Sequence, residues 1–241
     1  MKILLISNST MSGEPYLDYP KHEIKKFLGD TPVTAILIPY ASIILSYDEY
    51  CERVDQRFSE VGHHVIGLHT FADPVKAINN AEAIIIGDGN TWQLVRKLHD
   101  MKLINPIREK VFNGTPYIGW SAGTNVACPT MRTTNDMPVI EPRRLDCVGL
   151  VPFQINPHYL DSQVAGHAGE TREQRILEYI ELYPETYVVG LREGTMLKLE
   201  DEKLCLIGNQ KCRIFKKGKD PAELSSCDDL SFLMESGFLS R

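Results

Sequence analysis

The sequence lacks any apolar run long enough to serve as a signal peptide or to cross a membrane. The first run, KILLIS, covers residues 2–7 and ends at Ser7 and Asn8, whereas a membrane-spanning helix needs about 20 apolar residues. We interpret this run as a first buried strand. We therefore expect a cytoplasmic protein without membrane contact.

An excess of basic residues is also missing. The chain has 26 Lys and Arg against 32 Asp and Glu, which gives a formal net charge of −6. Such a chain has no general positive field to attract nucleic acid or anionic lipid. We expect no nucleic-acid partner, and an acidic substrate would have to be bound by individual Arg or Lys side chains.

Paired cysteine and metal-ligand motifs are absent as well. The six cysteines are scattered without a CxxC pair, and no HExxH motif occurs. These spacings are the ones that structural and catalytic zinc sites use. We expect free thiols in a reducing cytosol and no metal site.

What the sequence does contain is an alternation of β-branched runs with helical patterns. Its 241 residues, 43% of them hydrophobic, fit one α/β domain over residues 1–241. The predicted strands are 2–7, 33–41, 64–70, 83–87 and 115–120, and the predicted helices are 21–30, 46–62, 73–81 and 90–100. This alternation predicts a mostly parallel sheet flanked by helices on both faces.

The pattern changes after residue 128. Residues 129–150 have no clear periodicity and contain several prolines, which predicts a long loop of the kind that is often functional. The C-terminal third then becomes more β-like, and its predicted strands are 186–191, 195–200, 203–208 and 212–218. Short turns separate these runs, so we expect antiparallel strands added to the edge of the parallel sheet.

The stretch YIGWSAGTN places a serine between an apolar strand and the start of a helix. Gly119, Ser121 and Gly123 form the G-x-S-x-G motif of a nucleophile elbow. Glycines relieve the crowding of such a sharp turn, and N–H groups at a helix N-terminus stabilise developing negative charge. We predict that Ser121 is a nucleophile and that the N–H of Ala122 is an oxyanion donor.

A serine nucleophile needs a base, and the base needs an orienting acid. His158 follows the strand-like run VPFQINP and so belongs at a strand end, where sites form in open α/β sheets. His167, in the loop AGHAGE, is the alternative base. Glu193 follows a predicted strand and Asp136 lies in the loop after the elbow, and the sequence leaves both open as the acid.

A second Gly-rich turn, IIIGDGNTWQL, covers residues 84–94. It lacks the G-x-G-x-x-G and GK[ST] patterns of phosphate-binding loops, and Asp88 in its middle would repel a phosphate. We predict that the backbone of Gly89 supplies a second oxyanion donor.

Seven stretches occur in an order that resembles the peptidase E family, the aspartyl dipeptidases among the serine peptidases. These stretches are ISNST, GDGNTWQL, YIGWSAGTN, CPTMRTTNDMP, QINPHY, GHAGETREQRI and GLREG, and the resemblance runs from residue 2 to about residue 216. It implies a fold related to the class I glutamine amidotransferases and cytosolic hydrolysis of dipeptides with N-terminal aspartate. It implies no metal and no organic cofactor.

The resemblance also implies roles for individual residues. Ser121 matches the family's nucleophile and His158 its base, while Glu193 and Asp136 both match positions proposed for the third member. The family's Gly-rich turn usually reads GGGNT, so Asp88 is a departure from the family pattern.

Specificity for aspartate requires a cation in the site. Arginine suits a carboxylate because its planar fork can donate two parallel hydrogen bonds. Arg172 is the first candidate, followed by Arg132 and Arg175. The candidates for binding the free amine of the substrate are Asp136, Asn135 and Glu170.

Two other classes of protein stay open at this point. One is a different α/β acyl hydrolase, such as an esterase, whose triad order of Ser, acid and His would be met if Asp136 were the acid. The other is a non-catalytic module that binds a small ligand through GDGNT. The sequence does not show exposed patches, so a homodimer is left open too.

Overall fold

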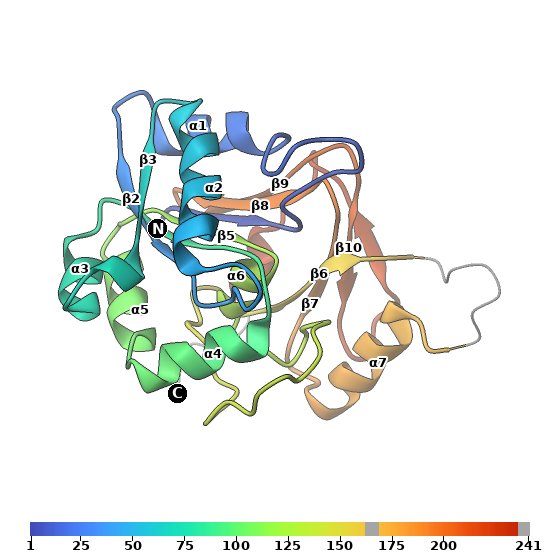
Figure 1. Ribbon diagram of the computed structural model, residues 1–241. Helices are drawn as coiled ribbons and strands as arrows, with labels where there is room; N and C mark the ends of the chain where they lie inside the picture. The colour runs from blue at the N-terminus through green and yellow to red at the C-terminus, as the bar shows by residue number, and fades with distance from the viewer. Residues whose placement is uncertain (162–168, 236–241) are drawn as a thin grey trace.

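The computed structural model describes residues 1–161 and 169–235 and contains two β-sheets (Figure 1). The larger sheet has the strand order β3-β2-β4-β5-β1-β8-β9. Its strands are β1 (Ile3–Ile6), β2 (Thr34–Ile38), β3 (His64–Gly67), β4 (Ile84–Ile86), β5 (Tyr117–Trp120), β8 (Met196–Glu200) and β9 (Lys203–Ile207). Strands β1 to β5 pair in parallel, and β8 and β9 continue the sheet antiparallel beyond β1. The predicted parallel sheet with antiparallel edge strands is confirmed for these elements.

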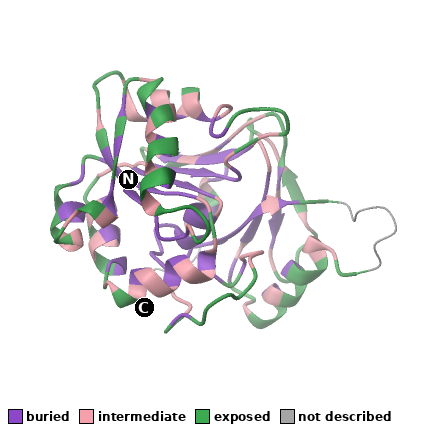
Figure 2. Ribbon diagram, in the orientation of Figure 1, coloured by how far each residue is buried: buried purple, intermediate pink, exposed green. Residues whose placement is uncertain are grey.

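Helices cover both faces of this sheet. They are α1 (Lys21–Leu28), α2 (Tyr47–Ser59), α3 (Pro74–Asn80), α4 (Thr91–Asp100), α5 (Ile104–Phe112) and α6 (Ala122–Val126). Successive strand residues face opposite sides, so Leu4 packs in one buried cluster with α1 and α2, while Leu5 packs in another with α3 to α6. Strands β1, β4 and β5 are fully buried between the two helix layers, whose outer surfaces are exposed (Figure 2).

A second, four-stranded sheet corrects part of the prediction. Its order is β11-β10-β7-β6, with β6 (Gln154–Tyr159), β7 (Val188–Arg192), β10 (Cys212–Phe215) and β11 (Ala222–Leu224). Two of the C-terminal strands expected at the edge of the parallel sheet, β7 and β10, lie here instead. Helix α7 (Arg172–Leu182) packs on this sheet through a small apolar cluster of its own, beside β6, β7 and β10 (Figure 1).

Local signals explain several of the element ends. Helix α2 begins with a reciprocal capping box between Ser46 and Glu49. Helix α1 ends at Gly29, whose φ of +94° favours glycine. The predicted strand over 64–70 is shorter, because the 3₁₀ helix η1 (Leu68–Thr70) replaces its end; a second 3₁₀ helix, η2, covers Ser231–Glu235.

The loop over residues 129–150 has neither helix nor extended strand, as predicted. Its two ends are tied together by an isolated antiparallel bridge between Thr130 and Asp146, and Met131 and Val148 are buried near them. Within the described ranges, no helix is both long enough and apolar enough to cross a membrane.

Candidate active site

Ser121 occupies the strained turn between β5 and α6. Its φ of +51° and ψ of −109° are unusual for a residue with a side chain. The turn is also crowded: a Cβ on Gly119 would lie 2.6 Å from the Gly123 carbonyl oxygen, and one on Gly123 would lie 1.8 Å from the carbonyl oxygen of Ile86. The two glycines of the motif therefore allow the backbone to approach itself closely.

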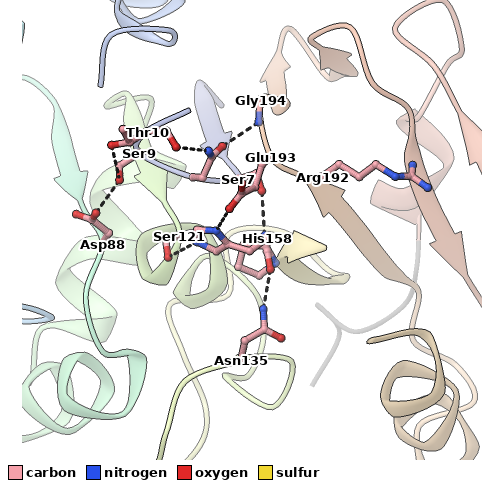
Figure 3. A network of polar contacts seen from close by, with 12 residues as sticks. Ser7, Ser9, Thr10, Asp88, Ser121, Asn135, His158, Arg192, Glu193 and Gly194 are labelled. Carbon is pink, nitrogen blue, oxygen red and sulfur yellow. Dashed lines mark hydrogen bonds and ion pairs between the residues drawn. The ribbon is translucent and has the colours of Figure 1, made fainter. Parts of the chain in front are cut away.

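His158 lies at the end of β6 with its ring between Ser121 and Glu193 (Figure 3). Its Nε2 is 2.9 Å from the Ser121 Oγ, and its Nδ1 is 2.7 Å from Oε1 of Glu193. In the tautomer with its proton on Nδ1, the ring donates to Glu193, and Nε2 is free to accept from the serine hydroxyl. Ser121, His158 and Glu193 thus form one continuous hydrogen-bonded series, which we call the Ser–His–Glu relay.

Asp136 has different partners from Glu193. Its Oδ2 accepts hydrogen bonds from the N–H of Thr91 at 2.7 Å and from the Thr91 hydroxyl at 2.6 Å. Thr91 is the first residue of α4, where free N–H groups favour an acidic side chain. Of the two acids that the sequence leaves open, Glu193 contacts the ring of His158 and Asp136 contacts the start of α4.

The two predicted oxyanion donors lie on separate turns. Ala122 is the first residue of α6, so its N–H has no acceptor within the helix. Gly89 follows β4 with a φ of +132°, and a Cβ there would lie 2.3 Å from the carbonyl oxygen of Ala41. Position 89 therefore requires glycine.

The carboxylate of Asp88 is accommodated in its turn by four hydrogen-bond donors. Its Oδ1 accepts from the hydroxyls of Tyr16 and Tyr50 at 2.6 and 2.7 Å and from Nε1 of Trp120 at 3.1 Å. Its Oδ2 accepts from Ser9 at 2.8 Å (Figure 3). Burial, together with this nearby carboxylate, raises the pKa of Tyr16 and Tyr50 well above the ordinary value, so both keep the protons they donate.

Arg172, the first residue of α7, is linked through Asn135 to the backbone next to His158. Its guanidinium donates to Oδ1 of Asn135, and the Nδ2 of Asn135 donates to the carbonyl oxygen of Pro157 at 2.7 Å, one residue before His158. Burial lowers the pKa of Arg172, and the nearby Asp136 opposes this effect. Within the part of the chain that the structure describes, the Arg172 guanidinium forms no ion pair with a carboxylate.

The remaining candidates are engaged elsewhere. Arg132 is exposed and stacks over the ring of Tyr183 at 5.5 Å from its centroid. Arg175 forms an ion pair with Glu170 at 3.6 Å. The alternative base, His167, lies outside the described residues.

Sequence reasoning assigned no role to Ser7 and Asn8. Both are buried at the carboxyl end of β1, where they contact the segments that carry His158 and Glu193. The available signal was their position, because polar residues at the carboxyl end of a strand in such a sheet lie where sites form.

Metal ligands do not gather in the described ranges. Residues 1–161 and 169–235 contain no group of three or more His, Cys, Asp or Glu side chains that could hold an ion.

A serine on a strained turn, next to a histidine that contacts a carboxylate, is the arrangement of serine hydrolases. Comparison with known proteins narrows this class. The profile of peptidase family S51 matches residues 3–207. The chain therefore belongs to peptidase family S51 and is a hydrolase of peptide bonds.

Two curated relatives share one name. Peptidase E from Nostoc sp. is 50% identical over 234 residues, which cover 97% of each chain. Peptidase E from Salmonella typhimurium is 41% identical over 226 residues, which cover 94% of this chain and 98% of the relative.

Solved structures share the fold at low sequence identity. A peptidase from an acI-B1 actinobacterium superposes with a TM-score of 0.67 at 17% identity and covers 96% of both chains. A putative peptidase E protein from Listeria monocytogenes superposes with a TM-score of 0.64 at 18% identity and covers 87% of this chain and 98% of its own.

Proposed function

We propose that the protein is a serine dipeptidase that cleaves the peptide bond after an N-terminal aspartate. The observation that carries this proposal is the Ser–His–Glu relay together with Arg172, which is linked through Asn135 to the backbone next to His158. Among the described residues, the Arg172 guanidinium has no carboxylate partner. The name peptidase E, shared by relatives at 41–50% identity, supports a peptidase over an esterase or a ligand-binding module.

In the proposed mechanism the aspartyl group of the substrate is transferred first to Ser121 and then to water. Nε2 of His158 takes the proton of Ser121 as its Oγ attacks the carbonyl carbon of the aspartyl residue, and Glu193 stabilises the imidazolium that forms. The N–H groups of Ala122 and Gly89 stabilise the oxyanion. His158 then protonates the leaving amine, and a water molecule, deprotonated by His158, releases aspartate from Ser121.

We assign the third position of the triad to Glu193. Its Oε1 lies 2.7 Å from Nδ1 of His158, the atom that an orienting acid must contact. Asp136 instead stabilises the start of α4 through Thr91. In this assignment Asp136 has a structural role at the start of α4 and takes no part in proton transfer, which His158 carries out.

We assign the binding of the substrate's aspartate side chain to Arg172. The Arg172 side chain is half-buried, and its hydrogen-bond partner Asn135 is anchored to the carbonyl oxygen of Pro157. This anchoring holds the guanidinium close to the segment that carries His158. A carboxylate bound there would pair with a partly desolvated cation, and such a pair contributes more binding free energy than an exposed ion pair does.

Matched p-nitroanilides test this assignment. Asparaginyl-p-nitroanilide has the shape of aspartyl-p-nitroanilide without its side-chain charge. Hydrogen bonds to charged groups contribute about 1.5–3 kcal/mol, so Arg172→Met should lower kcat/KM for the aspartyl compound by about 10- to 150-fold and leave the asparaginyl compound unchanged. Arg132→Met, which removes an exposed arginine stacked on Tyr183, serves as the control. An Arg172→Met enzyme that keeps its preference for aspartyl would contradict the assignment.

We also propose that the protein works in a reducing compartment, the cytosol. Cys128, Cys147 and Cys212 are buried, where thiols pack as small apolar groups. Burial raises the pKa of Cys212 to about 12, which keeps this thiol protonated and unreactive.

A further inference from the structure

We propose that Ser7 and Asn8 are positioning residues that align the base and the acid of the relay with its nucleophile. The inference rests on the proposed function, because it takes Ser121, His158 and Glu193 as the reacting triad. Neither the Ser7 nor the Asn8 side chain forms a hydrogen bond with the side chains of the relay. Both act through backbone groups of the segments that carry His158 and Glu193.

The need for such residues comes from the topology. Ser121 follows β5 of the seven-stranded sheet, whereas His158 and Glu193 come from β6 and β7 of the four-stranded sheet. Among the residues that the structure describes, no strand pairing joins these two sheets. The 2.9 Å contact between Ser121 and His158 therefore depends on what holds the two sheets in register at this point.

The carboxyl end of β1 provides that junction (Figure 3). Strand β1 pairs with β5, with Ile6 opposite Trp120, and the carbonyl oxygen of Ile6 accepts the N–H of Ser121 at 3.2 Å. The next two residues, Ser7 and Asn8, contact the other sheet. Three successive residues thus touch the backbones of all three segments that carry the relay.

Ser7 connects β1 to β6 and β7 at once. Its Oγ accepts the N–H of His158 at 3.0 Å and donates to the carbonyl oxygen of Leu191 at 2.8 Å. The side chain is completely buried, so water cannot replace either bond. His158 has a φ of +55° at a break in the register between Pro157 and Tyr159, a strained conformation that persists only where its surroundings hold it.

Asn8 holds the turn that follows Glu193. Its Oδ1 accepts the N–H of Gly194 at 2.9 Å and the hydroxyl of Tyr19 at 2.7 Å. Its Nδ2 donates to the carbonyl oxygen of Thr10 at 2.9 Å. With 2% of its surface exposed, Asn8 fixes the backbone one residue beyond the carboxylate that contacts His158.

Loss of the Ser7 hydroxyl should therefore slow the reaction without weakening substrate binding. Ser7→Ala leaves the N–H of His158 and the carbonyl oxygen of Leu191 buried without that partner, so the strained segment relaxes. A misplacement of about 1 Å can lower a rate about 100-fold. We expect kcat to fall about 10- to 100-fold with KM unchanged.

Ser231→Ala is the matched control. The Oγ of Ser231 also accepts a strand N–H, that of Leu204, at 3.2 Å. Leu204 pairs with Leu199, which pairs with Ile3 at the opposite end of β1 from the site. This variant loses the same kind of bond without contact to the relay, and its kcat should match that of the wild type.

The test measures each variant in two backgrounds, wild type and His158→Ala. The readouts are kcat and KM on aspartyl-p-nitroanilide, the midpoint of thermal unfolding, and the rate at which a fluorophosphonate labels Ser121. If Ser7 acts through His158, Ser7→Ala slows turnover and labelling in the wild-type background and has no further effect in His158→Ala. Equal losses in both backgrounds, a change in KM alone, or no loss would each overturn the proposal.

Asn8 provides a second arm should Ser7→Ala fail to fold. Asn8→Ala removes the acceptor for the N–H of Gly194, whereas Asn8→Asp keeps an oxygen there. We expect slower labelling of Ser121 in the alanine variant and recovery in the aspartate variant. Equal labelling rates for the two variants would count against the role of Asn8.

The labelling rate also separates this inference from the proposed substrate. A wild type that leaves aspartyl-p-nitroanilide intact, but whose Ser121 is labelled at a rate that depends on Ser7, would overturn the substrate and support the positioning role.

Discussion

Gly123→Ala is the substitution for which the structure makes the sharpest quantitative prediction. A Cβ at this position would lie 1.8 Å from the carbonyl oxygen of Ile86, whereas real Cβ contacts essentially never fall below 3.0 Å. The elbow must therefore move away from β4 by about 1.2 Å. Both groups are backbone atoms of buried elements, so no flexible side chain can absorb the shift.

Two measurable effects follow from this displacement. Overpacking of a well-packed interior typically costs about 1–3 kcal/mol, and for a protein of this size each kcal/mol lowers the unfolding midpoint by about 2–4 °C. The same shift carries Ser121 with it, because the N–H of Asn125 bonds to the Ser121 carbonyl oxygen in the same turn. A misplacement of about 1 Å predicts a loss of about 100-fold in kcat.

Gly218→Ala separates the two effects. Gly218 has a φ of +77° and nothing within 4 Å of its added Cβ, so alanine there costs about 1–2 kcal/mol of backbone strain in a turn between β10 and β11. Thermal unfolding and turnover of aspartyl-p-nitroanilide are measured for both variants. Similar destabilisation with a lower kcat in Gly123→Ala alone is the expected result, and a Gly123→Ala enzyme with wild-type stability and turnover would refute the reasoning.

Two further predictions concern charges. Glu193→Gln should lower kcat by about 10⁴-fold because the amide no longer favours the required tautomer of His158. Asp136→Asn should chiefly weaken the start of α4, by about 1 kcal/mol. A larger loss of kcat in Asp136→Asn than in Glu193→Gln would exchange the two roles. Hydrogen bonds from Arg192 hold the pKa of Asp161 below its ordinary value of 3.8, so this pair stabilises the fold above that pH and loses its effect as the pH falls through the lower folded pKa. Urea unfolding should accordingly show a flatter loss of stability below about pH 4 in Asp161→Asn, and an unchanged slope would contradict the assignment.

Several elements with strong local signals were predictable from the sequence, but two helices, α5 and α7, were missed. The glycine at 29 and the periodicity of residues 46–62 gave the positions of α1 and α2 to within a few residues. Helix α5 was absent from the prediction; Pro106 lies in its first turn, where proline is tolerated. Helix α7 was missed even though Thr171 and Gln174 form a capping box at its start.

The second sheet could not be deduced from local patterns. The pairing of β6 with β7 and of β7 with β10 joins segments that the sequence separates by a helix or by two strands. Periodicity marks a strand as half-buried but does not say which neighbour it pairs with. For this reason β7 and β10 were predicted as strands and assigned to the wrong sheet.

The same distinction holds within the site. Ser121 and His158 follow runs that read as strands, so their meeting at strand ends was predictable. The choice between Glu193 and Asp136 as the acid depends on which of them contacts the histidine ring, and this is a tertiary contact. The role proposed for Ser7 depends on a hydrogen bond across 151 residues of chain, which no local signal encodes.

Hydrolysis of aspartyl-p-nitroanilide by the wild type and by Ser121→Ala, with leucyl-p-nitroanilide as the control, tests the central claim most directly. The account predicts turnover of the aspartyl compound alone, lost in Ser121→Ala while the variant keeps the unfolding midpoint of the wild type. A folded Ser121→Ala enzyme with activity comparable to that of the wild type would contradict the role of Ser121 as the nucleophile.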